Sequence, residues 1–599
     1  MVGYGSDCDD GAFSLMPSDD EDGFTKTEFE ADDEDGFAQC LATPLVQVFS
    51  VCVSTDFDDG KPCEIHGSIR VFEEGSDCHY YNLYDRFPGD SETILESGTL
   101  SLIGPHDGAI IPSMRTTLVF RLKDRIHDVD VVNGDLKLDL TTEGSYDRLQ
   151  KGVVKGAHGS AVVYYVVFRF AIYGYVQVTV SKNDNNDDKN CNTVDIYGSV
   201  VARYENGRMY CSDEEDNDLK QLETRLFYHP SCVPLRVLAG THIRMSRTVV
   251  AVPAYSTLVI EVNLWDLNGK IASDELKFPA YLQSEDPVYI ETQYARVEVQ
   301  ILWRNAYLDP NMVQRRPKVF HDQHLLASLV PRTLPMTKPY WGNLKAEVFT
   351  VFVGGINEKI SALCGTISVD DGSLDRYSIY KTDESCKELL RDHSSLVCIE
   401  FNYRAIQNCE FYVILNLTDP VGKLEVSRGY ACFHLGYHGQ NMYERRLCSI
   451  VPGKDGYAAV HFEVFAYAFE AFLEVKLFAA NGDLNIPISL YGTLLACYSG
   501  HNYSTSYEKL YYKSRLIDRP LDSAVKSKTG SEIAMLKSIV VVPARSTLII
   551  EANLNAFGIN NVVELIHGKA EFEINMHDTI SKIIRGQDYG IDISVKFTN

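Results

Sequence analysis

The strongest constraint on the fold of this chain is a short phrase that recurs four times along it. The phrase joins a glycine to serine or threonine among strand-forming residues, and its copies are Gly67-Ser68, Gly198-Ser199, Gly365-Thr366 and Gly492-Thr493. Some fifty residues after each copy comes a second apolar phrase, and these phrases begin at Thr117, Thr257, Phe411 and Thr547. A period of about 130 residues is a whole domain and not a solenoid unit. The sequence therefore predicts four related units, in which the recurring glycine allows a bulge or a close backbone approach.

The units are expected to be all-β. Apolar and polar residues alternate over 296–303, 346–353 and 590–597, which is the pattern of half-buried strands. No segment with helical periodicity is longer than about three turns. Seven or eight short strands in about 130 residues favour a sandwich, because an open sheet would leave one face wet. We expect two tandem modules, each a pair of antiparallel β-sandwiches.

The chain is long enough for about four domains of 100–150 residues, and its 45% hydrophobic content supplies their cores. Proline and basic residues crowd the stretch between the second and third units, which predicts a linker. The expected segments are an acidic tail (1–43), half 1a (44–172), half 1b (173–304), the linker (305–343), half 2a (344–468) and half 2b (469–599).

Two apolar stretches, Ala161–Val180 and Ala458–Phe478, lie across the junctions between halves. Each is interpreted as two successive strands, one closing a half and one opening the next. A membrane-spanning interpretation is disfavoured, because Arg169 lies in the middle of the first stretch and Glu463, Glu470 and Glu474 lie within the second. We therefore expect no transmembrane segment.

The net charge is −27, which argues against DNA or RNA as the main partner. Residues 1–40 carry thirteen acidic residues and the single base Lys26, so this tail is expected to be disordered. The alternative is that the tail docks onto a basic partner. No basic region followed by an apolar run is found at the N-terminus, so we expect no secretory signal.

The fifteen cysteines include no Cys-x-x-Cys pair. Several lie in strand-like phrases, namely Cys52, Cys364, Cys398 and Cys497. Reduced and mostly buried thiols in a cytoplasmic or nuclear protein are the expected arrangement.

Four phrases of the first module resemble a known family. Val46–Val51, Leu102–Pro105, Tyr197–Arg203 and Ser246–Pro253 are similar to an uncharacterised domain that is abundant in cereal grasses. That domain forms the C-terminal part of the sixty-kilodalton jasmonate-induced protein of barley. The domain is about as long as one module, so two tandem copies of it would account for nearly all of the chain after residue 44. The second module departs from it, since Leu102–Pro105 has no clean counterpart there. The resemblance implies a grass origin and a stress or defence setting, without a mechanism.

The jasmonate-induced relative also carries a ribosome-inactivating domain, whose chemistry uses a Glu-x-x-Arg pair on a helix. This chain has three such pairs: Glu205/Arg208, Glu388/Arg391 and Glu425/Arg428. Only Glu388/Arg391 could lie on a helical turn, and no surrounding segment resembles the toxin domain. We expect no catalytic residues, and ribosome association would rest on the resemblance alone.

Metal sites were sought among histidines and acidic loops. The pairs His321/His324 and His434/His438 have no carboxylate or thiol at ligand spacing on a convincing helix. Acidic loops follow the strands of the first module, and their residues are Asp56, Asp58, Asp59, Asp124, Asp128, Asp130, Asp184, Asp187, Asp188, Asp266 and Asp274. Converging carboxylates could bind calcium, but aspartate is also favoured in turns. We expect neither a metal site nor a cofactor.

These observations favour a non-enzymatic intracellular protein that binds an unknown protein partner or a small ligand. The first alternative is a calcium-dependent adaptor at a membrane surface. The second is a relative of the ribosome-inactivating enzymes that has kept the accessory domain without the toxin.

Overall fold

The computed structural model describes residues 42–599 except for a set of short segments and the long stretch 305–341. The segments left out are 58–61, 73–79, 95–96, 107, 113–115, 183–192, 206, 211–221, 268, 293–294, 357–359, 373–375, 384–387, 390–395, 398–404, 407–409, 435–442, 481, 483–484, 502 and 558–562. The acidic tail and most of the predicted linker therefore lie outside the described residues.

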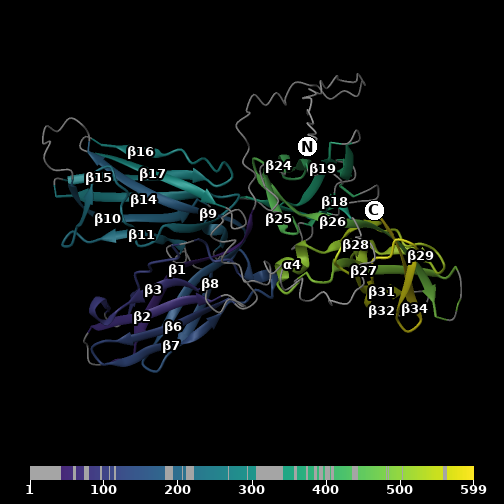
Figure 1. Ribbon diagram of the computed structural model, residues 1–599, viewed down its shortest axis with the longest axis horizontal. Helices are drawn as coiled ribbons and strands as arrows, with labels where there is room; N and C mark the ends of the chain where they lie inside the picture. Colours follow the sequence, from purple (N-terminus) through teal and green to yellow (C-terminus); the bar gives the residue numbers. More distant parts are fainter. Residues whose placement is uncertain are drawn as a thin grey trace, which may run out of the picture. The chain divides into compact units, whose positions relative to one another are not determined.

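Each half contains an outer sheet with the same strand order, which Figure 1 shows for the two halves of the first module. In half 1a the order is β3 (Tyr80–Arg86), β2 (Cys63–Phe72), β6 (Thr117–Asp124) and β7 (Val129–Lys137), with β4 (Glu92–Ile94) beside β2. In half 1b it is β11 (Thr224–His229), β10 (Thr193–Tyr204), β14 (Thr257–Asp266) and β15 (Gly269–Pro279), with β12 (Leu235–Leu238) beside β10.

The second module repeats this order. In half 2a the strands are β20 (Tyr377–Thr382), β19 (Ala362–Asp370), β23 (Glu410–Asp419) and β24 (Leu424–His434), with β21 (Glu388–Leu389) beside β19. In half 2b they are β28 (Ser514–Arg519), β27 (Pro487–Tyr498), β31 (Leu548–Phe557) and β32 (Val563–Phe572), with β29 (Val525–Lys528) beside β27. The two recurring sequence phrases are thus the two central strands of every outer sheet, and they pair antiparallel with each other.

The recurring glycine has a conformation that other residues rarely adopt. Its φ is 114° at Gly67, 119° at Gly198, 125° at Gly365 and 116° at Gly492. A Cβ at these positions would lie 1.9–2.3 Å from a carbonyl oxygen of the neighbouring central strand. The predicted close approach of two backbones is therefore confirmed, and it explains why glycine is kept in all four copies.

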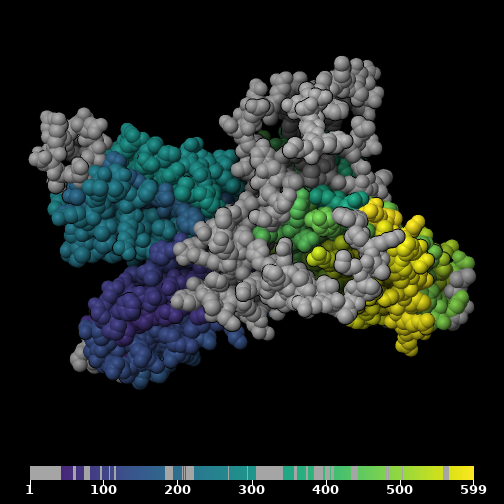
Figure 2. Space-filling view, in the orientation of Figure 1, coloured from purple at the N-terminus to yellow at the C-terminus, as the bar shows by residue number. Residues whose placement is uncertain are grey.

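A central sheet runs through both halves of each module. In the first module its order is β16 (Val288–Glu291), β17 (Ala295–Arg304), β9 (Gly159–Lys182), β1 (Thr43–Thr55) and β5 (Ser97–Thr99), with β8 (Gln150–Lys155) and β13 (Val249–Pro253) also paired to β9. In the second it is β33 (Ile580–Arg585), β34 (Tyr589–Thr598), β26 (Gly456–Ala479), β18 (Asn343–Gly355) and β22 (Leu396–Val397), with β25 (Arg446–Pro452) and β30 (Ile539–Pro543) paired to β26. The C-terminal strands form the yellow surface in Figure 2.

The interpretation of each apolar stretch as two strands was wrong. β9 and β26 are single strands of 24 residues each. The partners of β9 change at Ala171, which faces Thr43 of half 1a and Pro253 of half 1b. Because no proline or polar turn interrupts these stretches, the strand continues and the sheet changes partners along it.

A buried polar network joins the two halves of the first module through this sheet. Gln47 of β1 accepts a hydrogen bond from the Ala251 backbone N–H (2.9 Å) and donates one to the Thr224 hydroxyl (3.0 Å). The guanidinium of Arg247 donates to the backbone carbonyls of Val48 (2.8 Å) and Phe49 (3.3 Å). Both side chains are buried, so these hydrogen bonds replace the water that each would otherwise lose.

The second module places a charged pair at the same positions. Glu347 accepts from the Val541 backbone N–H (2.8 Å), the Tyr498 hydroxyl (2.6 Å) and the Ser514 hydroxyl. Its Oε1 lies 3.5 Å from the ammonium of Lys537, which also donates to the Val348 carbonyl (2.6 Å). The glutamine–arginine pair of one module therefore corresponds to a glutamate–lysine pair in the other.

Short helical segments complete the described fold. The helix α4 (Ser506–Tyr511) begins with a capping box, in which Thr505 and Glu508 accept each other's backbone N–H. The 3₁₀ turns are η1 (Pro88–Asp90), η2 (Glu143–Ser145), η3 (Gly207–Tyr210) and η7 (Leu521–Ser523). No helix among the described residues is long and apolar enough to cross a membrane. The predicted all-β class, with antiparallel sheets in two tandem modules, is confirmed.

Side chains of the two modules also pack against each other. The rings of Tyr255 and Tyr457 stack at 4.2 Å with an interplanar angle of 3°. The Arg169 guanidinium donates a hydrogen bond of 2.8 Å to the Tyr511 hydroxyl. Arg169, which had argued against a membrane span, thus has a polar partner in the other module.

Candidate functional site

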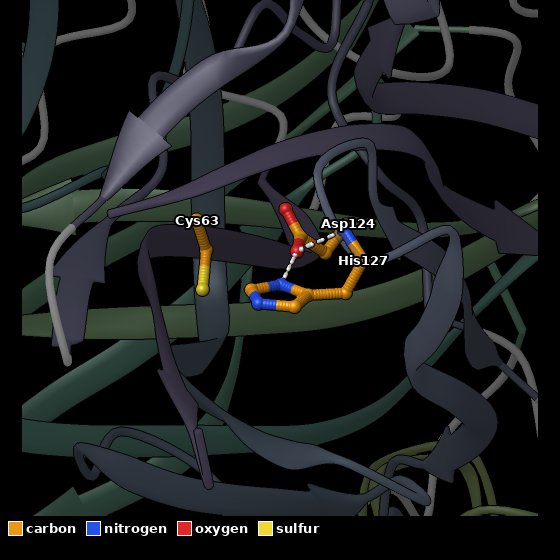
Figure 3. Close-up of side chains that lie close together, drawn as sticks. All are labelled: Cys63, Asp124 and His127. Carbon is orange, nitrogen blue, oxygen red and sulfur yellow. Dashed lines mark hydrogen bonds and ion pairs between the residues drawn. The ribbon is translucent and has the colours of Figure 1, made fainter. Parts of the chain in front are cut away.

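The outer sheet of half 1a brings together three side chains of the kinds that bind metal ions. Cys63 begins β2, Asp124 ends β6, and His127 lies in the turn between β6 and β7. One potential ligand atom from each lies within 4.8 Å of the others. Figure 3 shows the imidazole of His127 between the sulfur of Cys63 and the carboxylate of Asp124. Cys63 and Asp124 are buried, whereas His127 is partly exposed.

Backbone hydrogen bonds fix the position of the Asp124 carboxylate. Its Oδ1 accepts from the N–H groups of Glu64 (2.7 Å) and Ile126 (3.3 Å), and its Oδ2 accepts from the N–H of His127 (3.0 Å) and interacts with the His127 ring at Nδ1. Burial alone would raise the pKa of Asp124, but the hydrogen bonds from Glu64 and His127 outweigh it and lower the pKa. The carboxylate is therefore ionised and immobile.

Aromatic packing orients the imidazole. The ring of Phe57, which follows β1, stacks on His127 at a centroid distance of 4.2 Å and an interplanar angle of 18°. The thiol of Cys63 donates to the Thr55 hydroxyl, also on β1, at 3.5 Å. The cluster therefore depends on contacts between the outer sheet and the segment that ends the central strand β1.

The aspartate of this cluster has counterparts in other halves, whereas the cysteine and histidine do not. Asp419 of half 2a ends β23 and accepts hydrogen bonds from the backbone of Ser361, Val421 and Gly422. Asp266 of half 1b ends β14 and accepts from the backbone of Gly269 (2.8 Å). An aspartate that fixes the hairpin turn is thus part of the common scaffold. What distinguishes half 1a is the thiol and the imidazole placed beside it.

Within the described parts of the acidic loops, no carboxylate cluster of the kind that calcium would need is found. Asp124 is bound by backbone N–H groups, and Asp130 interacts with Asn133 and Lys123. Phe57 and His127 do bring the loops after β1 and β6 together, as the calcium hypothesis required. The group that assembles there, however, contains one carboxylate with a thiol and an imidazole. Asp58, Asp59, Asp184, Asp187 and Asp188 lie outside the described residues.

Among the described residues, no Glu-x-x-Arg pair lies on an α-helix, although Arg208 belongs to the 3₁₀ turn η3. Glu388, for which the sequence allowed a helical turn, belongs to strand β21, and Arg391 lies outside the described residues. Both Glu425 and Arg428 belong to β24. Glu205 follows β10 and forms an ion pair with Lys277 of β15. Pairing between strands therefore decides the structure of these segments, where the sequence spacing had left a helix open.

The histidine pairs weighed as metal ligands and the thiols expected to be buried are only partly among the described residues. His434 is the last residue of β24, while His321, His324 and His438 lie outside the described residues. Cys364 and Cys497 are buried in β19 and β27, and Cys52 of β1 is partly buried. Cys398 is not among the described residues.

A second feature is an exposed apolar side chain that recurs at one end of the halves. Opposite the recurring glycine, β3, β11 and β28 end at Arg86, His229 and Arg519. The loops that follow carry Phe87, Val233 and Leu521, which are 77%, 60% and 62% exposed. We call this end of each half the loop end. It includes the tip of the hairpin between the last two strands of the outer sheet, such as β6 and β7 in half 1a.

The hairpin tips at the loop ends also expose apolar residues. Ile126 follows β6, Leu267 follows β14 and Val421 follows β23, and all three are exposed. Each comes one or two residues after the aspartate that fixes the turn. The turns of Ile126 and Val421 are held by the hydrogen bonds of Asp124 and Asp419, so fixing these two side chains for binding costs little conformational entropy.

Comparison with known proteins identifies the modules. A family model described as Domain of unknown function (DUF6598) matches residues 45–301 and again residues 345–595. Each match covers both halves of one module. No curated protein matches the chain. Among solved structures, it is similar to one of Extended-Synaptotagmin 2 that spans the SMP domain and two C2 domains of that protein, at 10% identity, with 71% of this chain and 88% of that chain covered and a TM-score of 0.16. A TM-score this low supports no inference about fold or function.

Proposed function

The chain belongs to the DUF6598 family, of which it contains two tandem copies, and from this premise we propose that it is a non-enzymatic intracellular binding protein. We propose further that it binds a partner protein through the loop ends of its β-sandwiches. The observation that carries this proposal is the apolar side chain exposed at the same loop in three halves, at Phe87, Val233 and Leu521.

The recurrence matters because a single exposed apolar residue needs no explanation. These three residues differ in identity but share apolar character, high exposure and a place in the loop that follows the strand facing the glycine. They are too exposed to contribute to the core, so the core does not account for them. Burying apolar surface of this kind against a partner is favourable by about 25 cal/mol per Å².

The charge of the chain favours a protein partner over a membrane surface. A net charge of −27 opposes approach to anionic lipids. Calcium could offset that repulsion only where several carboxylates converge, and Asp124, Asp130 and Asp266 are held instead by backbone N–H groups or by a neighbouring side chain. The calcium-dependent adaptor is therefore the weaker alternative. A ribosome-inactivating relative has less support still, because no Glu-x-x-Arg pair among the described residues lies on an α-helix.

An intracellular setting is part of the proposal. Its support is the buried thiols Cys364 and Cys497, which suit a reducing compartment. The stress or defence setting rests on the resemblance to the jasmonate-induced family alone.

The experiment compares partner capture from the source tissue by three full-length proteins. The test variant is Phe87→Ser/Val233→Ser/Leu521→Ser. The matched control is Val153→Ser/Ile583→Ser, which removes exposed apolar side chains from the strands β8 and β33 instead. We expect the wild type and the control to capture the same protein and the triple variant to lose it.

A parallel sedimentation assay uses phosphatidylserine vesicles with and without calcium. If calcium causes the wild type to bind the vesicles and the triple variant does not bind, the loop ends bind a membrane surface and the proposed protein partner is wrong. Equal capture of the partner by all three proteins would show that the loop ends do not bind it.

A further inference from the structure

The cluster of Cys63, Asp124 and His127 differs in chemistry from every site that the sequence pattern suggested. A thiol, an imidazole and a carboxylate form a ligand set that suits zinc and related transition metals. Calcium and magnesium take oxygen ligands almost entirely, and calcium needs six to eight of them. Because one carboxylate is present, the set is unsuited to calcium.

The arrangement also has the supports that metal sites usually have. The Asp124 carboxylate is held in place by the backbone of Glu64 and Ile126 through Oδ1, so that Oδ2 faces the imidazole. Phe57 stacks on His127 and limits rotation of its ring. Such contacts fix the orientation of the ligands, as the groups around metal ligands do in established sites.

We propose that Cys63, His127 and Asp124 bind one divalent ion of the zinc class. The ligands are the Cys63 thiolate, a ring nitrogen of His127 and the Asp124 carboxylate, with the remaining position open. Binding releases the thiol proton of Cys63 to solvent, and the imidazole of His127 keeps its proton on the ring nitrogen that does not bind the ion. The partial exposure of His127 gives the ion a route from solvent.

The ion would act directly on the loop end of half 1a. His127 follows the exposed Ile126, and Cys63 is bonded to Thr55 near the end of β1. A metal bridge would therefore link the hairpin tip to the start of β2, next to the end of β1. This site does not depend on the proposed partner protein, and its test requires no partner.

The test uses the full-length protein and cobalt as a spectroscopic substitute for zinc. We expect one cobalt ion to bind per chain and to produce a thiolate-to-cobalt charge-transfer band, which zinc abolishes by competition. The band should disappear in Cys63→Ser and in His127→Gln. It should persist in Cys364→Ser, which alters a buried cysteine of the equivalent strand β19, itself bonded to a threonine (Thr418, 3.2 Å).

Thermal unfolding supplies an independent measurement. At roughly 100 times its dissociation constant, zinc should raise the Tm of the transition that includes half 1a by about 5 °C. Calcium at the same concentration should leave it unchanged. Full cobalt absorption in Cys63→Ser or His127→Gln, its loss in Cys364→Ser, or stabilisation by calcium in place of zinc would each overturn the proposal. His127→Gln keeps the test valid if Cys63→Ser does not fold, because its side chain is partly exposed on a turn.

Discussion

Replacing the recurring glycine should be much more costly than replacing a glycine that has only an unusual φ. Half 1b offers a matched pair: Gly198 has φ 119° and Gly240 has φ 81°. A Cβ at Gly198 would lie 2.1 Å from the Asn263 carbonyl oxygen, whereas a Cβ at Gly240 would meet nothing within 4 Å. The two alanine variants therefore separate the cost of the dihedral angle from the cost of the steric overlap.

The expected magnitudes follow from these two terms. A left-handed conformation costs an ordinary residue about 1 kcal/mol, which is the expected effect of Gly240→Ala. Gly198→Ala carries the same backbone strain, and its Cβ also pushes β10 away from β14. The strands then lose hydrogen bonds worth about 1 kcal/mol each, so the expected loss of stability is about 3 kcal/mol in total. A loss of about 3 kcal/mol corresponds to roughly a hundredfold larger population of the opened sheet.

Hydrogen exchange followed by mass spectrometry is the appropriate assay, because a chain of several domains does not unfold in one step. Peptides covering β10 and β14 should lose protection about a hundredfold in Gly198→Ala and several-fold at most in Gly240→Ala. Equal protection of these peptides in the two variants would refute the reasoning, since the close backbone approach would then carry no cost.

The other predictions concern buried charge, pH and the contact between modules. Glu347→Gln should destabilise the second module by about 3 kcal/mol or more, because Lys537 stays buried without its carboxylate. Glu347→Gln/Lys537→Arg should recover part of this stability, because it recreates the glutamine–arginine pair of the first module. Thermal unfolding measures both variants, and no recovery would contradict the equivalence of the two buried pairs. Burial lowers the pKa of His461 to about 3, so the unfolded chain binds this proton first as the pH falls below about 6.5. The free energy of unfolding should therefore decline by up to about 1.4 kcal/mol per pH unit from about pH 6.5 down to about pH 3. His461→Phe should flatten that decline in acid titrations followed by fluorescence. A protease cut within 305–341 should leave two fragments that elute together in gel filtration, because Tyr255 stacks on Tyr457 and Arg169 bonds to Tyr511, and separate elution would exclude that contact in solution.

Local sequence rules predicted those parts of the fold that depend on a single residue or a short pattern. The recurring glycine was recognised because a backbone with φ near +120° admits hardly any other residue. The alternating phrases were recognised as strands because period two is the signature of a half-buried sheet. The continuous 24-residue strand β9 was missed, since strands of about five or six residues are usual and nothing in the sequence marks a change of partners at Ala171.

The candidate site was missed for a different reason. Cys63 and Asp124 are 61 positions apart and meet only because β2 and β6 pair in one register. The aspartate was noted as part of an acidic loop, but no spacing rule connects it to that cysteine. His127 lies three residues after Asp124 in the sequence. A histidine next to an acidic turn was the one sequence feature that pointed to a metal site there.

The different buried pairs of the two modules limit how the halves can be recombined. A hybrid of half 1a with half 2b would bring Gln47 to Lys537 and leave an ammonium group in the interior without a carboxylate. The opposite hybrid would bring Glu347 to Arg247 and join a carboxylate to a guanidinium. One exchange is therefore penalised and the other tolerated, although the sheets are the same. After duplication, each copy thus became committed to its own second half, which opposes the sequence exchange that would otherwise make tandem copies uniform.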